Sequence, residues 1–227
     1  MHTGGDVSMS IREIIAIIII VFIYSAVGTQ VYATVNSNPG NKSDSADVQK
    51  PLAIGDTIPN ITVTSTMGKV TSLRRLISKK PTIVIFYRGG WCPYCNAHLV
   101  KIQQIEPNLI HLGYQIIAIS PDRIVELDKT IDKHHLTYSL YSDSAMIAAK
   151  AFGLAYTVDS LTLTKMQLHG VDLEKASGQK HHMLPVPAAF VVDKKGIIRF
   201  AHSNPDIKVR IDPNDLLSKA REALEVK

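Results

Sequence analysis

Cysteine is scarce in this chain of 227 residues, where it occurs only as Cys92 and Cys95. Two cysteines are too few to staple a small fold with disulfides, and a bridge across so few residues removes little chain entropy. The spacing, three positions apart, is instead typical of a redox pair or of one half of a metal site. A second CxxC motif is missing, so only histidines are available to complete such a metal site. Cysteine usage therefore indicates chemistry rather than scaffolding.

A basic stripe is also missing. The 25 Lys and Arg residues exceed the 20 Asp and Glu residues, for a net charge of +5, but the two signs are mixed along the chain. No nucleic-acid-binding motif accompanies this charge, so nucleic acid is not an expected partner. Hydrophobic residues make up 45% of the chain, which is enough for one well-buried core. We therefore expect a single domain.

The amino terminus has no Lys or Arg before Arg12, and residues 14–27 (IIAIIIIVFIYSAV) form an apolar run without a charge. A run of this length is typical of a secretory signal peptide, here with a cleavage site after Ala33. If the helix continues, residues 14–33 reach the length of an uncleaved membrane anchor. No cysteine follows the run, which excludes a lipid-anchored lipoprotein. Residues 1–33 are thus predicted to be a signal peptide or a membrane anchor.

Both interpretations place the rest of the chain outside the cytoplasm, as a periplasmic, extracellular or membrane-anchored protein. Residues 34–50 (TVNSNPGNKSDSADVQK) are polar and have almost nothing to bury. Such a composition predicts a disordered linker. The folded domain is then expected over residues 51–227.

Short apolar runs alternate with amphipathic segments from residue 51 onward. Residues 82–87 (TIVIFY) and 115–120 (QIIAIS) are β-branched and continuously apolar, as in central strands covered on both faces. The other predicted elements are strands at 61–65 and 137–142, helices at 72–78, 99–112, 124–131 and 145–152, an irregular insertion at 154–184, a hairpin of 188–192 with 197–201, and a last helix from 213. This order predicts an α/β, thioredoxin-like fold with a mixed central sheet flanked by helices.

The two thiols lie where the strand at 82–87 gives way to the next helix. Unpaired backbone N–H groups and the helix dipole favour a thiolate at such a position. Two cysteines three apart at a helix start also close a disulfide with little backbone movement, which makes a two-electron switch. Trp91 is expected to shield one side of the pair, and Gly89 and Gly90 to let a partner approach. Arg88 is expected to favour the thiolate or to hold an anionic ligand.

The motif at residues 88–95 (RGGWCPYC) resembles that of the alkyl hydroperoxide reductase and thiol-specific antioxidant (AhpC/TSA) family, in its peroxiredoxin-like branch. The resemblance extends over nearly all of residues 51–227. It includes Gly55-Asp56 with Pro59, Ile119-Ser120-Pro121, Ser142-Asp143, residues 151–154 (AFGL) and residues 186–193 (VPAAFVVD). It implies a thioredoxin-like fold. It also implies a cis peptide bond before Pro187, with the Val186 backbone left free to hold an extended substrate or partner chain.

The resemblance leaves two assignments of the thiols open. On the peroxiredoxin pattern PxxxTxxC, Cys95 takes the attacking place and Cys92 replaces the threonine. Arg88 then replaces the proline, and Pro187 stands where an activating arginine is usual. On the thioredoxin pattern, Cys92 is the exposed nucleophile and Cys95 resolves the mixed disulfide, while Phe86 stands where a buried aspartate is usual. Spacing alone does not decide which thiol attacks first.

Three functions follow as hypotheses. The first is a thiol-dependent peroxidase without a cofactor, which reduces hydrogen peroxide or alkyl hydroperoxides through a cysteine sulfenic acid and a Cys92–Cys95 disulfide. Its partners are the peroxide and an external dithiol, which outside the cytoplasm must be delivered across the membrane. The second is an extracytoplasmic thiol-disulfide oxidoreductase. The third is a copper or zinc module completed by His181 and His182.

Overall fold

The computed structural model describes residues 50–225. The predicted signal peptide or anchor at residues 1–33 lies outside the described residues, as does the predicted linker except for Lys50. Within residues 50–225, no helix combines the length and the apolarity needed to cross a membrane.

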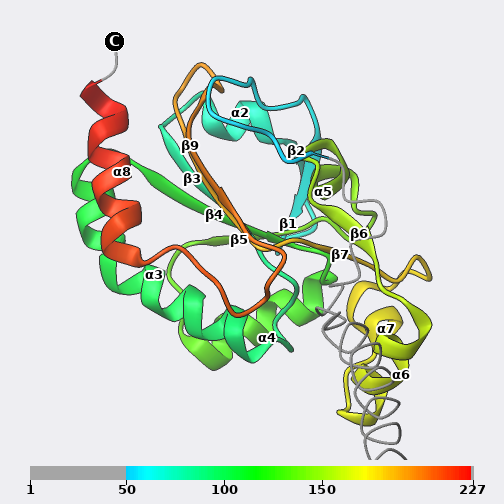
Figure 1. The fold of residues 1–227 in the computed structure, drawn as a ribbon. Helices are drawn as coiled ribbons and strands as arrows, with labels where there is room; N and C mark the ends of the chain where they lie inside the picture. The colour runs from blue at the N-terminus through cyan, green and yellow to red at the C-terminus, as the bar shows by residue number, and fades with distance from the viewer. Residues whose placement is uncertain (1–49, 226–227) are drawn as a thin grey trace, which may run out of the picture. The chain divides into compact units, whose positions relative to one another are not determined.

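A mixed sheet of seven strands forms the centre of the domain, in the order β2-β1-β5-β4-β3-β8-β9 (Figure 1). The strand β3 runs parallel to β4 and antiparallel to β8, and β4 runs parallel to β5. The strands are β1 (Thr62–Ser65), β2 (Val70–Ser72), β3 (Thr82–Phe86), β4 (Gln115–Ser120), β5 (Ser139–Ser142), β8 (Ala188–Val192) and β9 (Ile198–Ser203). The predicted thioredoxin-like fold with a mixed sheet is confirmed.

The central strands divide their side chains between two cores. Ile83 and Ile85 of β3 pack with α3, α4 and α8 on one face, whereas Val84 and Phe86 pack with α2 and α5 on the other. Successive side chains of a strand point to opposite faces, so an unbroken apolar run is what a doubly covered strand requires. The helices are α2 (Leu73–Ile77), α3 (Pro93–His111), α4 (Ile124–His134), α5 (Ile147–Ala151) and α8 (Pro213–Glu225).

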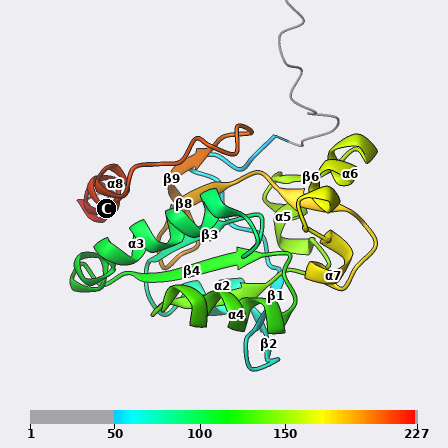
Figure 2. The same ribbon diagram turned by 90° about the horizontal axis from the view of Figure 1, so that it is seen from below.

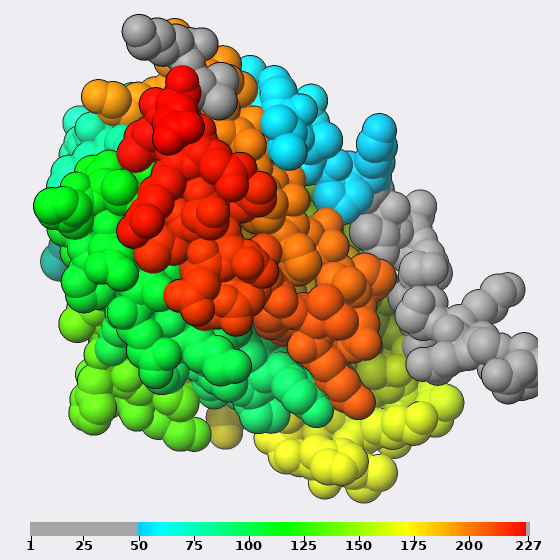
Figure 3. All heavy atoms as spheres, turned by 60° about the vertical axis from the view of Figure 1, so that its left-hand side comes forward, coloured from blue at the N-terminus to red at the C-terminus, as the bar shows by residue number. Residues whose placement is uncertain are grey.

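Helices α3 and α8 lie against each other on the first face. Figure 3 shows α8 in red across the green residues of α3. Leu99 and Ile102 of α3 and Leu216 of α8 are fully buried in the same core. Tyr114, just after α3, donates a hydrogen bond of 2.9 Å from its hydroxyl to the Ala220 carbonyl of α8. The C-terminal helix is therefore held by apolar packing and by one buried hydrogen bond.

The segment at 154–184 is ordered, which corrects the prediction of an irregular insertion. It contains β6 (Ala155–Thr157), α6 (Ser160–Leu168), α7 (Leu173–Ser177) and β7 (Met183–Pro185), and β6 pairs with β7 in a small antiparallel sheet (Figure 1). Figure 2 shows α6 and α7 on the same side of the domain as β6. The prediction failed because α6 buries none of its residues, and so has no apolar periodicity to detect. Asp159 and Asp172 cap α6 and α7 with their side chains.

Three phenylalanine rings pack together in the core on the second face of the sheet, and their packing can be tested by substitution. The Phe152 ring lies 4.8 Å from that of Phe86 and 5.3 Å from that of Phe190, and Phe152 is fully buried. We expect Phe152→Ala to lower the free energy of unfolding by about 3–5 kcal/mol, since it leaves a cavity. Leu168→Ala, at a side chain 81% exposed on α6, is the matched control and should change it by less than about 0.5 kcal/mol. Urea denaturation measures both, and equal midpoints would contradict the packing described.

Candidate active site

The two thiols meet at the start of α3. Cys92 is the N-cap residue of this helix and Cys95 lies in its first turn, behind Pro93. The backbone N–H groups of Cys95 and Asn96 donate to the Cys92 carbonyl at 3.1 and 3.0 Å. This turn brings the Cys95 thiol to 2.7 Å from the Cys92 sulfur, to which it donates a hydrogen bond. Both cysteines are reduced and only 1% exposed, so the exposed nucleophile expected on the thioredoxin pattern is instead buried.

This hydrogen bond separates the two thiols chemically. Together with the backbone N–H of Cys95, and against the effect of burial, it lowers the pKa of Cys92 to about 6. The pKa of Cys95 is raised well above its ordinary value, because its proton is held by Cys92 and because it is buried. The thiol that ionises near neutral pH is therefore Cys92.

Arg88 and Trp91 pack against each other in the segment that leads into the thiols. The shielding of the pair by Trp91 stays a prediction. The Arg88 guanidinium carbon lies 5.1 Å from the centre of the Trp91 ring, a cation–π distance. Arg88 is only 7% exposed, and its charge helps to lower the pKa of Cys92. Its interaction with Trp91 keeps this buried cation next to the thiolate.

A second arginine, which the sequence analysis did not single out, also reaches the pair. Arg210 lies in the loop between β9 and α8, and its Nη2 atom is 3.7 Å from the Cys95 sulfur. Its positive charge lowers the pKa of both cysteines. Arg210 is 115 positions from Cys95, in a loop without a recognisable motif, so no local signal pointed to it. The pair thus has two cationic neighbours from distant parts of the chain.

Gly89 and Gly90 let the loop pack closely against the rest of the protein, and their expected role in admitting a partner stays a prediction. A Cβ on Gly90 would lie 1.9 Å from Oγ1 of Thr130 on α4. A Cβ on Gly89, whose φ is +145°, would lie 2.8 Å from an oxygen of Asp122. The loop before Cys92 is therefore pressed against α4 and against the end of β4.

Asp122 is a further residue of the site that the sequence analysis missed. It follows Ser120 and Pro121 at the end of β4, is 1% exposed, and accepts a 2.7 Å hydrogen bond from the Gly90 N–H. Burial raises its pKa to about 7, against the opposing effect of that hydrogen bond. The carboxyl group both fixes the loop and stays partly protonated at neutral pH.

The Val186-Pro187 segment differs from the expectation. No peptide bond in residues 50–225 is cis, so the bond before Pro187 is trans. The Val186 N–H is not free for a partner chain, because it donates to the Leu154 carbonyl at 2.7 Å. The physical reason is the small sheet: β7 ends at Pro185 beside β6, and the extended chain continues directly into β8. Val186 and Pro187 are both buried.

The histidine pair has other contacts. His181 Nε2 lies 2.7 Å from the Ser144 carbonyl, and His182 Nε2 lies 2.9 Å from a Glu174 oxygen. Within the part of the chain that the structure describes, no group of three His, Cys, Asp or Glu residues is arranged to hold a metal ion. The geometry therefore gives no support to the copper or zinc hypothesis.

The family assignment follows from comparison with known sequences. The profile of the AhpC/TSA family matches residues 54–201, which include the thiols and most of the sheet. The chain belongs to the AhpC/TSA family.

Within and around this family, the chain is similar to two kinds of curated protein. A putative peroxiredoxin bcp of Haemophilus influenzae is 30% identical over 104 residues, which are 46% of this chain and 66% of that protein. The chloroplastic peroxiredoxin Q of Triticum aestivum is 24% identical over 150 residues, or 66% of this chain and 58% of that protein. The thiol-disulfide oxidoreductase ResA of Bacillus anthracis is 23% identical over 155 residues, or 68% of this chain and 83% of that protein. The chain thus spans less than two thirds of the length of these two peroxiredoxins.

Solved structures of AhpC/TSA-like proteins share the fold. Peroxidoxin BcpB from Mycobacterium tuberculosis superposes with a TM-score of 0.60 at 17% identity, covering 75% of this chain and 97% of that one. A DsbE-type putative thiol:disulfide interchange protein from Chlorobium tepidum gives a TM-score of 0.52 at 17% identity, with 76% and 99% covered. At such identities the likeness establishes the fold alone.

The order of ionisation is testable by alkylation. In the reduced protein, Cys92 should react with iodoacetamide faster than Cys95, with a rate that rises with pH around a midpoint of about 6. The rate rises because the thiolate forms above the pKa. Cys95→Ala removes the thiol donor and should move the midpoint upward, whereas the control Cys95→Ser keeps a hydroxyl donor and should move it less. Mass spectrometry after timed quenching measures both sites. Faster labelling of Cys95 would refute the assignment.

Proposed function

We propose that this AhpC/TSA protein is a thiol-dependent peroxidase in which Cys92 attacks and Cys95 resolves. The observation that carries this proposal is a thiol of lowered pKa held in a site almost closed to solvent. Hydrogen peroxide is small enough to reach a sulfur with so little exposure. The similarity to peroxiredoxins bcp and Q supports the same activity.

The chemistry uses the two sulfurs, the peroxide, water and an external dithiol. The Cys92 thiolate attacks the terminal oxygen of ROOH, so that an S–O bond forms while the O–O bond breaks. The leaving alkoxide takes a proton from water and departs as an alcohol, or as water when the substrate is hydrogen peroxide. The Cys95 thiol then attacks the Cys92 sulfenic acid, releasing water and forming the disulfide. An external dithiol supplies two electrons and two protons to restore both thiols.

The two arginines act on the charge that this reaction moves. Arg88 and Arg210 favour the thiolate before attack, since both lower the pKa of Cys92. Arg210 lies next to Cys95, in the loop between β9 and α8. If the peroxide enters along this loop, the alkoxide leaves near the Arg210 guanidinium. Fixed cations that meet developing negative charge stabilise a transition state. Arg210 would then take the part that the family pattern gives to an arginine at the Pro187 position.

A second candidate is a thiol-disulfide oxidoreductase. It is favoured by the same order of ionisation, Cys92 before Cys95, and by the similarity to ResA over 83% of that protein. Reduction of insulin by the dithiol-loaded protein separates the two functions, because the peroxidase should leave insulin disulfides intact. Trapping a mixed disulfide on Cys92 in a Cys95→Ser variant would favour this second function.

The compartment is part of the proposal. The apolar run at residues 14–27 would direct the domain out of the cytoplasm, as a cleaved signal or as an anchor over residues 14–33. The reductant would then be a thioredoxin-like or membrane-delivered dithiol outside the cytoplasm, because cytosolic thioredoxin has no direct access there.

Peroxide consumption tests the mechanism. Residues 50–227 with dithiothreitol should consume hydrogen peroxide or cumene hydroperoxide faster than dithiothreitol alone, and Cys92→Ser should abolish this. In Cys95→Ser the sulfenic acid cannot be resolved within the site, so a dimedone adduct should accumulate on Cys92. Mass spectrometry locates the adduct. Absence of peroxide consumption above that of the free dithiol would reject the peroxidase. A dimedone adduct on Cys95 in Cys92→Ser, with none on Cys92 in Cys95→Ser, would reject the proposed order of the thiols.

Arg210 provides a separate test. Arg210→Met should lower the second-order rate constant with hydrogen peroxide by about ten-fold to a hundred-fold, because one fixed cation is lost from the reacting sulfurs. Arg210→Lys should recover part of the rate. Arg221→Met, at an exposed position of α8, removes an equal charge and should leave the rate unchanged. Stopped-flow measurement of the first turnover gives these constants, and equal rates in all variants would exclude Arg210 from the reaction.

A further inference from the structure

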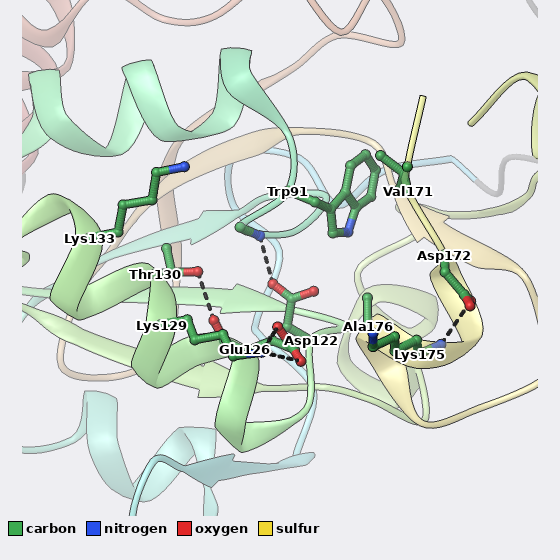
Figure 4. Close-up of a pocket in the computed structure, with 12 residues that line it drawn as sticks. Trp91, Asp122, Glu126, Lys129, Thr130, Lys133, Val171, Asp172, Lys175 and Ala176 are labelled. Carbon is green, nitrogen blue, oxygen red and sulfur yellow. Dashed lines mark hydrogen bonds and ion pairs between the residues drawn. The ribbon is translucent and has the colours of Figure 1, made fainter. Parts of the chain in front are cut away.

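A cavity of about 350 Å³ lies beside the active site, between α4 and the inserted segment (Figure 4). One wall is formed by Thr130 and Lys133 of α4, and the opposite wall by Val171 and Ala176 near α7. Trp91, the residue before Cys92, closes one end. The thiols themselves do not line it. The cavity therefore adjoins the reactive pair without belonging to it.

Some charged groups around this cavity form ion pairs and others do not. The Glu126 carboxylate contacts Arg123 at 3.2 Å and Lys129 at 3.1 Å, and an Asp172 oxygen accepts the Lys175 backbone N–H at 2.9 Å. The ammonium groups of Lys133 and Lys175 make no ion pair or hydrogen bond with any described residue. The Asp172 carboxylate makes no ion pair with a described residue either. The unpaired charges around the cavity are thus two lysines from separate elements against Asp172 and the partly protonated Asp122, which leaves a small positive excess.

Two hydrogen-bonding atoms without partners are buried directly behind the inner end of the cavity. One oxygen of Asp122 is taken by the Gly90 N–H, but its Oδ1 atom has no partner, and neither has Nε1 of Trp91. Figure 4 shows Asp122 below the Trp91 ring, between α4 and α7. The two atoms lie 2.8 and 2.3 Å from the point where a Gly89 Cβ would be, and so are close to each other. A buried acceptor and donor left without partners are costly, and a group that both donates and accepts relieves both.

We propose that this cavity binds a small organic carboxylate that carries a hydroxyl group at its other end. The carboxylate meets Lys133 and Lys175, the apolar body packs on Trp91 and Val171, and the hydroxyl donates to Asp122 Oδ1 and accepts from Trp91 Nε1. Both inner atoms are closed to solvent, so the indole must shift slightly to admit the hydroxyl. The ion pairs with Lys133 and Lys175 supply affinity for the carboxylate, and the hydrogen bonds at Asp122 and Trp91 fix the orientation of the ligand.

Binding is measurable without any turnover, because Trp91 is the only tryptophan of the chain. Fluorescence excited at a wavelength that selects tryptophan reports the surroundings of Trp91, which include this cavity, and the lysine variants below show whether the signal comes from the cavity. The probes are 3-(4-hydroxyphenyl)propionate, 3-phenylpropionate, which lacks the hydroxyl, and tyramine, which replaces the carboxylate with an ammonium group. We expect saturable change with the first, at least about ten-fold weaker binding of the second, and none with tyramine.

Variants locate the site. Lys133→Ala with Lys175→Ala should weaken binding of 3-(4-hydroxyphenyl)propionate by at least about ten-fold. The control is Lys194→Ala with Lys195→Ala, which removes the same charge from the exposed turn between β8 and β9. Ala176→Leu fills part of the cavity and should also weaken binding. The proposal would be overturned if 3-(4-hydroxyphenyl)propionate gave no saturable signal, or if tyramine or 3-phenylpropionate bound as tightly. It would also be overturned if the variant with both Lys133→Ala and Lys175→Ala kept its affinity. None of these outcomes depends on peroxide turnover, so the peroxidase proposal is judged separately.

Discussion

The hydrogen bond from the Cys95 thiol to the Cys92 sulfur is the interaction on which the chemistry of this site depends. Burial alone would raise the pKa of both thiols and leave the pair inert at neutral pH. The hydrogen bond outweighs burial at Cys92 and adds to it at Cys95, so that one sulfur ionises while the other keeps its proton. The two thiols, one that ionises and one that keeps its proton, are thereby distinguished within one helical turn.

That turn is held by packing on all sides. The strand β3 is buried along its whole length, and it ends one short loop before α3. Gly89 and Gly90 let this loop lie directly against Asp122 and Thr130, where a side chain would collide. The position of the thiols is thus determined by β4 and α4 as much as by the CxxC motif. Any substitution that moves these neighbours should act on the thiols indirectly.

The surroundings of the thiols are closed to solvent and positively charged. Both sulfurs are buried, and two arginines supply positive charge next to them. The inserted segment adds a cavity on the other side of Trp91, with charges that the rest of the described chain does not match.

The sequence by itself determined the buried central strands, the two thiols and the neighbouring Arg88 and Trp91, because these follow from local periodicity and from one contiguous motif. Buried strands such as residues 115–120 were predicted to the residue, since a doubly covered strand must be apolar throughout. The tertiary structure alone decided which thiol ionises, because hydrogen bonding and burial set that order. It also brought Arg210 and Asp122 to the site from distant segments. Only the structure showed that the inserted segment has regular helices and strands, since α6 buries none of its residues, and that the bond before Pro187 is trans. Contacts between residues far apart in the chain leave no local pattern, and for this reason no reading of the sequence alone identified them.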